Sequence, residues 1–149
     1  MQLNGDFNFN APQEQVWQLL MDPAVIAAAL PGVDELVPIE GEKDTWRAEA
    51  KINLAAVSGT YAGVIHMSEQ QPPRQYRLTV SGEGQQSIIN GSALITLNYD
   101  ETTGQTRLTW EAEPSISGKL ARVGQRLIKA AATMLSKQFF TAVAKQLPS

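Results

Sequence analysis

Residues 76–99 read YRLTVSGEGQQSIINGSALITLNY, and this stretch decides the fold class. Apolar or small residues alternate with polar ones on both sides of Gly82-Glu83-Gly84, which has the composition of a turn. A period of two residues is typical of a β-strand with one buried face and one wet face. The stretch therefore predicts two neighbouring antiparallel strands joined by a short connection.

The same alternation extends on both sides of this hairpin and predicts further strands of one meander. Their inward positions are Leu3, Gly5, Phe7 and Phe9; Trp46, Ala48, Ala50, Ile52 and Leu54; Tyr61, Gly63, Ile65 and Met67; Leu108, Trp110 and Ala112. In the central hairpin they are Tyr76, Leu78, Val80 and Gly82, then Ile89, Gly91, Ala93, Ile95, Leu97 and Tyr99.

Helices are predicted near both ends of the chain. Pro12 and Asp22-Pro23 favour the starts of two short helices after the first strand, and Pro31-Gly32 ends the second. One long helix is expected from 118 to 146, about 29 residues or roughly 43 Å. Its expected apolar stripe comprises Leu120, Val123, Leu127, Met134, Leu135, Phe139 and Val143.

This order of elements predicts an α+β fold. Helices confined to the ends of a run of strands are typical of that class, and 149 residues fit one domain, residues 1–149. A sheet of about seven strands with one wet face needs a large element on its other face. We expect a curved antiparallel sheet wrapped around the long C-terminal helix.

Composition excludes several function classes. The chain has 12 Lys and Arg, 15 Asp and Glu, one histidine and no cysteine. A net charge of -3 argues against nucleic acid as the partner, and the missing cysteines exclude thiolate chemistry and cysteine metal sites. The sequence has no apolar run of 18 residues and no signal-peptide pattern at its start. We therefore expect a cytoplasmic location.

Charge is distributed unevenly along the chain. The residues after Glu113 include no acid, so that segment carries +6 and the preceding 113 residues carry -9. Its six bases are Lys119, Arg122, Arg126, Lys129, Lys137 and Lys145. The first four share one side of the expected helix. They form either an ordinary solvated face or a docking surface for anionic lipid or an acidic partner.

Small residues recur on the predicted inward faces. They are Ala48, Ala50, Gly63, Gly82, Gly91, Ala93 and Ala112, with Gly124 and Ala130-Ala131-Ala132 on the facing helix. Small residues opposite small residues leave either a close approach of backbones or a void. The pattern therefore indicates either tight helix–sheet packing or an apolar ligand cavity under the helix.

Several short motifs give the chain a family resemblance over nearly its whole length. In order they are Leu30-Pro31-Gly32-Val33, the run VSGTYAGV at 57–64, Gly82-Glu83-Gly84, Asn90-Gly91-Ser92-Ala93, Gly118-Lys119-Leu120-Ala121, Gly124-Gln125-Arg126-Leu127 and Phe139-Phe140. In their order and spacing they resemble the CoxG family of carbon monoxide dehydrogenase subunits. That family belongs to the START-like (SRPBCC) helix-grip superfamily.

The resemblance implies a non-catalytic accessory protein of a carbon monoxide dehydrogenase-type molybdenum hydroxylase. It further implies an isoprenoid quinone or other lipid in the internal cavity, without a covalent cofactor or a metal, and peripheral contact with the cytoplasmic membrane. Many members continue into a membrane-attaching C-terminal segment. Because this chain ends at Leu147-Pro148-Ser149, we expect a soluble shuttle or a truncated member.

Inward phase selects the candidate ligand-binding residues. They are Trp46, Tyr61, Ile65, Met67, Tyr76, Ile95, Trp110, Leu127, Ala131 and Leu135. Leu30, Pro31 and Gly32 are the expected cavity rim, or else a plain helix stop and turn. The membrane or partner surface is Lys119, Arg122, Arg126 and Lys129.

Two alternatives remain at this point. One is a START-like enzyme of the cyclase or dehydratase kind, which needs a polar group in the cavity, such as Tyr61 or Tyr76. The other is an interaction module with a filled core. The residues give little support to catalysis, since Glu111 and His66 are expected on the wet face and no inward stripe carries a carboxylate.

Overall fold

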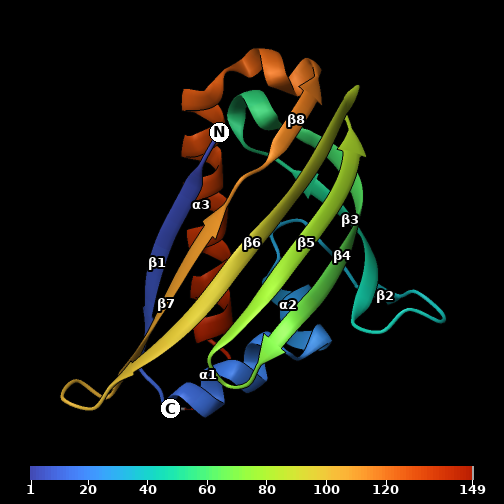
Figure 1. Ribbon diagram of the computed structural model, residues 1–149. Helices are drawn as coiled ribbons and strands as arrows, with labels where there is room; N and C mark the ends of the chain where they lie inside the picture. Colours follow the sequence, from blue (N-terminus) through green and yellow to red (C-terminus); the bar gives the residue numbers. More distant parts are fainter. Residues whose placement is uncertain (149) are drawn as a thin grey trace.

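The computed structural model describes residues 1–148; Ser149, the last residue of the expected domain, lies outside the described residues. Strand β1 (Leu3–Phe9) is followed by helices α1 (Gln13–Leu20) and α2 (Pro23–Ala29). The remaining strands are β2 (Val37–Pro38), β3 (Thr45–Ile52), β4 (Gly59–Gln71), β5 (Gln75–Gly84), β6 (Ser87–Asp100), β7 (Gln105–Ala112) and β8 (Ser115–Gly118). Two 3-10 helices, η1 (Ala55–Val57) and η2 (Lys119–Val123), and the long helix α3 (Gln125–Ala144) complete the order (Figure 1).

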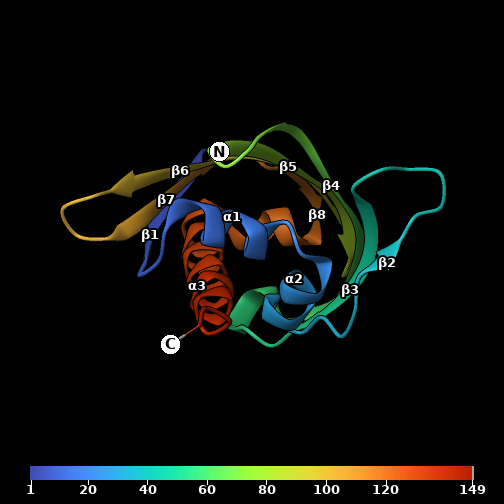
Figure 2. The ribbon, with the colours of Figure 1, turned by 90° about the horizontal axis from the view of Figure 1, so that it is seen from below.

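The strands form one antiparallel sheet in the order β1-β7-β6-β5-β4-β3-β2, with β8 paired to β6. Figure 2 shows this sheet as an arc around α3, with α1 and α2 across one end of the enclosed space. Strand β1 pairs with β7, so the last long strand of the meander lies beside the first strand. Helix α3 then crosses the inner face of the sheet (Figure 1). This arrangement confirms the predicted α+β helix-grip architecture.

One end of the interior is densely packed with aromatic and branched side chains. The Phe9 ring lies 4.8 Å from the ring of Phe7 and 6.4 Å from that of Phe140 on α3. Leu97 and Leu108 are fully buried on the same inner face. Edge and tilted aromatic contacts of this kind add to the burial of apolar area. This packed end attaches α3 to the β1 edge of the sheet.

The short helices begin as their sequence predicted. The Asp22 carboxylate accepts a hydrogen bond of 2.9 Å from the Ala24 backbone N–H, and Pro23 occupies the first turn of α2. In α1, Val16, Trp17 and Leu20 are buried at helical spacing. Both helices therefore turn an apolar side toward the space inside the sheet.

The C-terminal segment differs from its prediction. Residues 115–118 pair with β6 as a strand, residues 119–123 form a 3-10 helix, and α3 begins only at Gln125. Gly124 separates the two helices with a φ of 97°, a backbone conformation that favours glycine. The expected continuous helix from 118 is wrong because the backbone turns at this residue.

The break at Gly124 also corrects the expected apolar stripe. Leu127 is 52% exposed and Met134 is 49% exposed, whereas Ile128, Phe140 and Val143 are buried. The prediction continued one helical period of 3.6 residues across Gly124. It therefore placed the exposed residues Leu127 and Met134 on the buried face of the helix.

Tyr99 is likewise misassigned as inward and is 42% exposed. It lies near the tip of the β6–β7 hairpin, which projects beyond the body of the molecule in Figure 1. Among residues 1–148 no other element covers the hairpin there, so the alternation of β6 no longer defines a buried face.

Candidate functional site: an apolar cavity under the C-terminal helix

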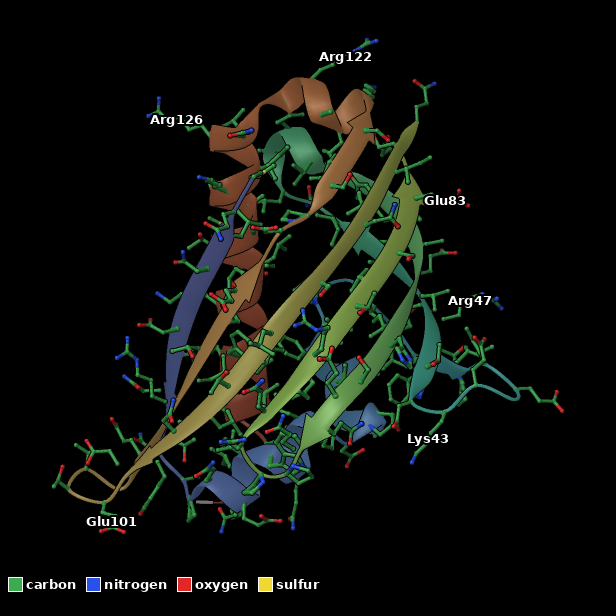
Figure 3. The ribbon with its side chains drawn as sticks, in the orientation of Figure 1. Lys43, Arg47, Glu83, Glu101, Arg122 and Arg126 are labelled. Atoms are coloured by element: carbon green, nitrogen blue, oxygen red, sulfur yellow. The ribbon has the colours of Figure 1, made fainter. Side chains whose placement is uncertain are left out.

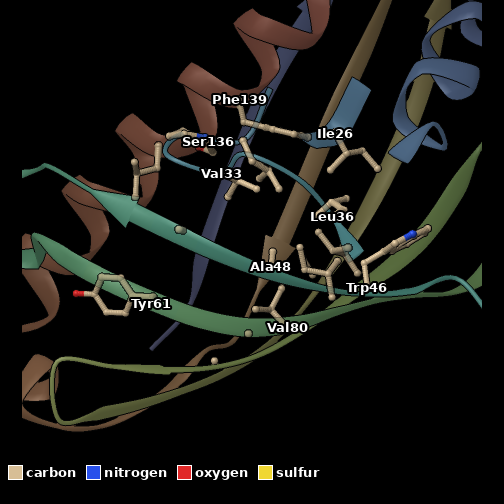
Figure 4. Close-up of a pocket in the computed structure, with 18 of the residues that line it drawn as sticks. Ile26, Val33, Leu36, Trp46, Ala48, Tyr61, Val80, Ser136 and Phe139 are labelled. Carbon is tan, nitrogen blue, oxygen red and sulfur yellow. The ribbon is translucent and has the colours of Figure 1, made fainter. Parts of the chain in front are cut away.

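An apolar cavity of about 420 Å³ lies between the sheet and α3. Helices α1 and α2 and the loop after α2 complete its wall. In Figure 4, Phe139 and Ser136 of α3 lie on one side of this space, with Ala48 and Val80 of the sheet on the other. The volume falls in the range of about 300–1,000 Å³ that is usual for small-molecule sites.

The register of the sheet explains why this space is open. Ala48 lies opposite Gly63, and Gly63 lies opposite Gly82, so three neighbouring strands place small residues in one row. All three residues line the cavity. Their small side chains leave space between this row and α3. A Cβ on Gly63 would also lie 2.8 Å from the Ser81 carbonyl oxygen, so both interpretations of the small residues apply here: a close approach of backbones and a cavity.

Close packing holds elsewhere on the inner face. A Cβ on Gly91 would lie 3.5 Å from the Pro114 backbone, so this glycine does not line the cavity and lies near the chain that enters β8. A Cβ on Gly5 would lie 2.7 Å from Trp110 Nε1. The indole of Trp110 therefore lies across Gly5 and covers the sheet next to the cavity.

The structure places most of the predicted ligand-binding residues in the cavity wall. These are Trp46, Tyr61, Ile65, Met67, Tyr76, Ile95, Trp110 and Leu135. Leu127 and Ala131 do not line it. Their exclusion follows from the phase of α3, in which Leu135, Ser136, Phe139 and Phe140 face the cavity.

Sequence reasoning missed part of the wall. The missed residues come from the helices and the following loop (Leu20, Ile26, Val33 and Leu36), from the strands (Ala48, Ala50, Ile52, Ala62, Gly63, Leu78, Val80, Gly82, Ile89 and Ala93) and from α3 (Ser136, Phe139 and Phe140). Several of the strand residues had already been noted as small inward residues. The residues of α1, α2 and their loop carry no comparable signal, because nothing local says that these helices close the sheet.

The expected rim is only partly in the wall. Leu30 and Pro31 line the cavity, whereas Gly32 is exposed and does not. The Gly32 carbonyl accepts a hydrogen bond of 2.9 Å from the Lys51 N–H of β3. Gly32 has a φ of 74°, and a Cβ there would overlap the Lys51 carbonyl oxygen. This residue fixes the rim loop to β3.

Polar groups are few in the cavity wall. The Tyr61 hydroxyl donates a 2.6 Å hydrogen bond to the Val57 carbonyl, and the Ser136 hydroxyl donates one of 3.1 Å to the Thr133 carbonyl. Burial raises the pKa of the Tyr76 hydroxyl well above its ordinary value. Within residues 1–148 the wall contains no carboxylate, histidine, lysine or arginine.

The residues considered for acid–base chemistry lie outside the cavity. His66 is exposed, and its Nδ1 lies 2.7 Å from the Thr45 hydroxyl oxygen. Glu111 and Glu113 are exposed on the outer side of the sheet. The geometry therefore places neither a carboxylate nor an imidazole of residues 1–148 in the cavity wall.

The four bases of the predicted surface are all exposed. Lys119 and Arg122 belong to η2, while Arg126 and Lys129 belong to the first turns of α3. Figure 3 shows Arg122 and Arg126 projecting from the end of the molecule opposite to Glu101. The ion pairs found within residues 1–148 join Arg77 to Glu69 and Arg107 to Asp6, so they involve none of the four.

A comparison with protein-family models matches residues 5–148 to the carbon monoxide dehydrogenase subunit CoxG. The chain belongs to the CoxG family. A comparison with curated proteins finds no match.

Several solved structures share this fold. A conserved protein from Geobacillus kaustophilus is 32% identical over 98% of this chain and 94% of its own, with a TM-score of 0.92. A START superfamily protein from Mycobacterium smegmatis (10% identity, 97% and 95% coverage, TM-score 0.74) shares the fold of this CoxG-family chain. So does the ZhuI aromatase/cyclase from Streptomyces sp. R1128 (13% identity, 98% and 92% coverage, TM-score 0.71). Among residues 1–148, no helix is long and apolar enough to cross a membrane.

Proposed function

We propose that this CoxG-family protein binds one apolar ligand, an isoprenoid quinone or another lipid, in the cavity between the sheet and α3. The observation that supports this is the 420 Å³ space with an almost wholly apolar wall. Water is held poorly in such a space because it finds few hydrogen-bond partners. Burial of a ligand's apolar surface in this cavity should stabilise the complex by about 25 cal/mol for each Å² removed from water.

The size of the cavity favours part of such a ligand. The volume lies toward the lower end of the usual range for ligand sites. It suits a ring system with a short apolar tail rather than a complete polyprenyl chain, whose remainder would pass the rim at Leu30 and Pro31. An open cavity also does not fit an interaction module with a filled core.

The proposed role is non-catalytic: the protein carries its ligand to or from a carbon monoxide dehydrogenase-type molybdenum hydroxylase, or positions that enzyme at the membrane. The family name supports the choice of partner, and the wall without a carboxylate or histidine supports the absence of acid–base chemistry. An enzyme of the ZhuI kind, active on a substrate in the same cavity, is the alternative that a turnover assay would reveal.

Lipid extraction tests the ligand. Purified protein analysed by native mass spectrometry should carry an apolar molecule, or should be stabilised against heat by added menaquinone. Ala48→Leu places a larger side chain in the row of small residues and should abolish both effects, while Ala28→Leu makes the same change on the exposed side of α2. Failure to recover any lipid, together with no stabilisation by menaquinone, would contradict the proposal.

Vesicle binding tests the surface. Four exposed cations each contribute about 1 kcal/mol near anionic lipid, falling off within a Debye length. The double variant Arg122→Glu and Arg126→Glu should weaken sedimentation with phosphatidylglycerol vesicles at least about tenfold. Lys43→Glu with Arg47→Glu, on the β2–β3 side of Figure 3, is the matched control. Equal losses in both double variants would show that net charge alone matters.

A further inference from the structure

Tyr76 differs from the other hydroxyl-bearing residues of the cavity wall. Tyr61 and Ser136 donate their hydroxyl protons to backbone carbonyls. No hydrogen bond joins the Tyr76 hydroxyl to another group within residues 1–148, although the residue is only 2% exposed. Polar groups on residues this deeply buried almost always have a partner in native structures, from the protein or from ordered water. This hydroxyl therefore needs an explanation.

The position of Tyr76 directs this hydroxyl to the cavity. Within residues 1–148 no side-chain oxygen or nitrogen is both sealed from open space and without a partner. The hydroxyl is therefore not sealed off, and since Tyr76 lines the cavity, we infer that the hydroxyl borders this space. Its ring is held edge-on to the Trp17 ring of α1, with centroids 5.6 Å apart. This contact restricts the orientation of the Tyr76 ring.

The surroundings of Tyr76 determine which chemical group it can bind. Its burial keeps the hydroxyl protonated, so it is available as a neutral donor. The wall offers no lysine, arginine or histidine to balance a negative charge. An ionised carboxylate or phosphate would stay uncompensated in this apolar space. A neutral oxygen acceptor, above all a carbonyl, suits the site.

We propose that Tyr76 is the polar contact of the cavity and donates a hydrogen bond to a carbonyl oxygen of an uncharged ligand. The ligand is then an apolar ketone or quinone, with its carbonyl end at β5 and α1, and fatty acids and charged lipids are excluded. This inference rests on the proposed function, since it specifies the ligand class of the same cavity.

A pair of probes separates the hydrogen bond from apolar binding. Menadione (2-methyl-1,4-naphthoquinone) carries two carbonyls, and 2-methylnaphthalene has a similar ring system without them. Affinities of the wild-type protein and of Tyr76→Phe should be measured for both by titration calorimetry. We expect Tyr76→Phe to weaken menadione binding about threefold to tenfold and to leave 2-methylnaphthalene within about twofold. Phenylalanine retains the ring that packs on Trp17.

Tyr61→Phe is the matched control, because its hydroxyl is already bonded to the Val57 carbonyl. It should change the affinities of both probes by the same factor. Infrared spectra give an independent readout: a carbonyl stretch of bound menadione should shift to lower frequency in wild type and lose that shift in Tyr76→Phe. Decanoate should bind at least about tenfold more weakly than menadione, because its charge stays uncompensated.

The outcomes distinguish this inference from the proposed function. If both probes bind and Tyr76→Phe affects them equally, or affects neither, the hydrogen bond is refuted while the apolar cavity stands. Decanoate binding as tight as menadione binding would refute the neutral-carbonyl ligand class. If neither probe binds the wild-type protein, the inference fails, and the proposed function then depends on the lipid-recovery and menaquinone experiment.

Discussion

The inner face of the sheet contains two regions that share one sequence pattern and differ in volume. At one end, Phe9, Leu97 and Leu108 are fully buried against Phe140 of α3. In the middle, Ala48, Gly63 and Gly82 form a row with the cavity beneath α3. Alternation selects the inward positions in both regions, but side-chain size decides whether α3 packs on the sheet or is held away from it. Contacts at the packed end thus hold α3 in place, and the small residues in the middle leave the cavity beneath it.

The two regions should respond differently to substitution, since packed interiors are sensitive to lost and added volume and an open cavity tolerates added volume. Equal effects of substitution in the two regions would show that the cavity collapses in solution.

Removing an aromatic ring from the packed end should have the largest effect. Phe9→Ala deletes a side chain that is fully buried between Phe7 and Phe140. We expect the free energy of unfolding, measured by urea titration, to fall by about 3–5 kcal/mol. A loss below about 1 kcal/mol would mean that this end is not tightly packed.

The rim loop should be the next most sensitive position. Gly32→Ala adds a Cβ that overlaps the Lys51 carbonyl at a positive φ of 74°, and we expect a loss of more than about 2 kcal/mol. Gly41→Ala has a similar φ of 81° with no atom within 4 Å of the added Cβ. It should cost only about 1–2 kcal/mol. Equal losses in urea titrations would show that the rim is not fixed to β3.

Adding the same volume to each region compares them directly. Ala11 is buried in the packed core, so Ala11→Leu should destabilise the protein by about 1–3 kcal/mol. Ala48→Leu extends into the cavity and should change the free energy of unfolding by less than about 1 kcal/mol. Similar losses for both variants, in parallel thermal and urea unfolding, would show that the cavity is absent in solution.

The pH dependence of stability reports on Tyr76. In the unfolded chain the hydroxyl ionises near its usual pKa of about 10, whereas burial raises the folded pKa above that. Above about pH 10 the unfolded state therefore loses a proton that the folded state keeps. Stability should be independent of this group below about pH 10 and fall above it by up to about 1.4 kcal/mol per pH unit.

Tyr76→Phe should remove that part of the high-pH loss, which urea titrations between pH 9 and pH 11 can measure. Tyr99→Phe alters an exposed tyrosine near the β6–β7 hairpin tip and serves as the control. Parallel pH profiles for wild type and Tyr76→Phe would contradict the buried, protonated hydroxyl.

Much of the fold and part of the site followed from local pattern. The inward positions of the strands that contain Trp46, Tyr76 and Trp110 were predicted from alternation, because a strand turns successive side chains to opposite faces. The order of these elements then predicted a sheet wrapped around a C-terminal helix, and the family resemblance agreed with it. These residues line the cavity as a consequence of strand phase.

The errors arose where the backbone departs from one period. Leu127 and Ala131 were assigned to the cavity from a helix counted across Gly124, whose φ of 97° ends one helix before α3 begins. Glycine is compatible with a helix interior as well as with such a turn. The sequence alone therefore offered no reason to restart the count.

By itself, the sequence determined most of the inward positions of the strands, how charge divides between the body and the C-terminal segment, and the family. The tertiary structure decided that Ala48, Gly63 and Gly82 stand in one row, that α1 and α2 close the end of the sheet, and that the Tyr76 hydroxyl has no hydrogen-bond partner among residues 1–148. Strand phase is a local property of the chain. Cross-strand register and enclosed volume depend on residues far apart in sequence, and they exist only once the sheet has closed around α3.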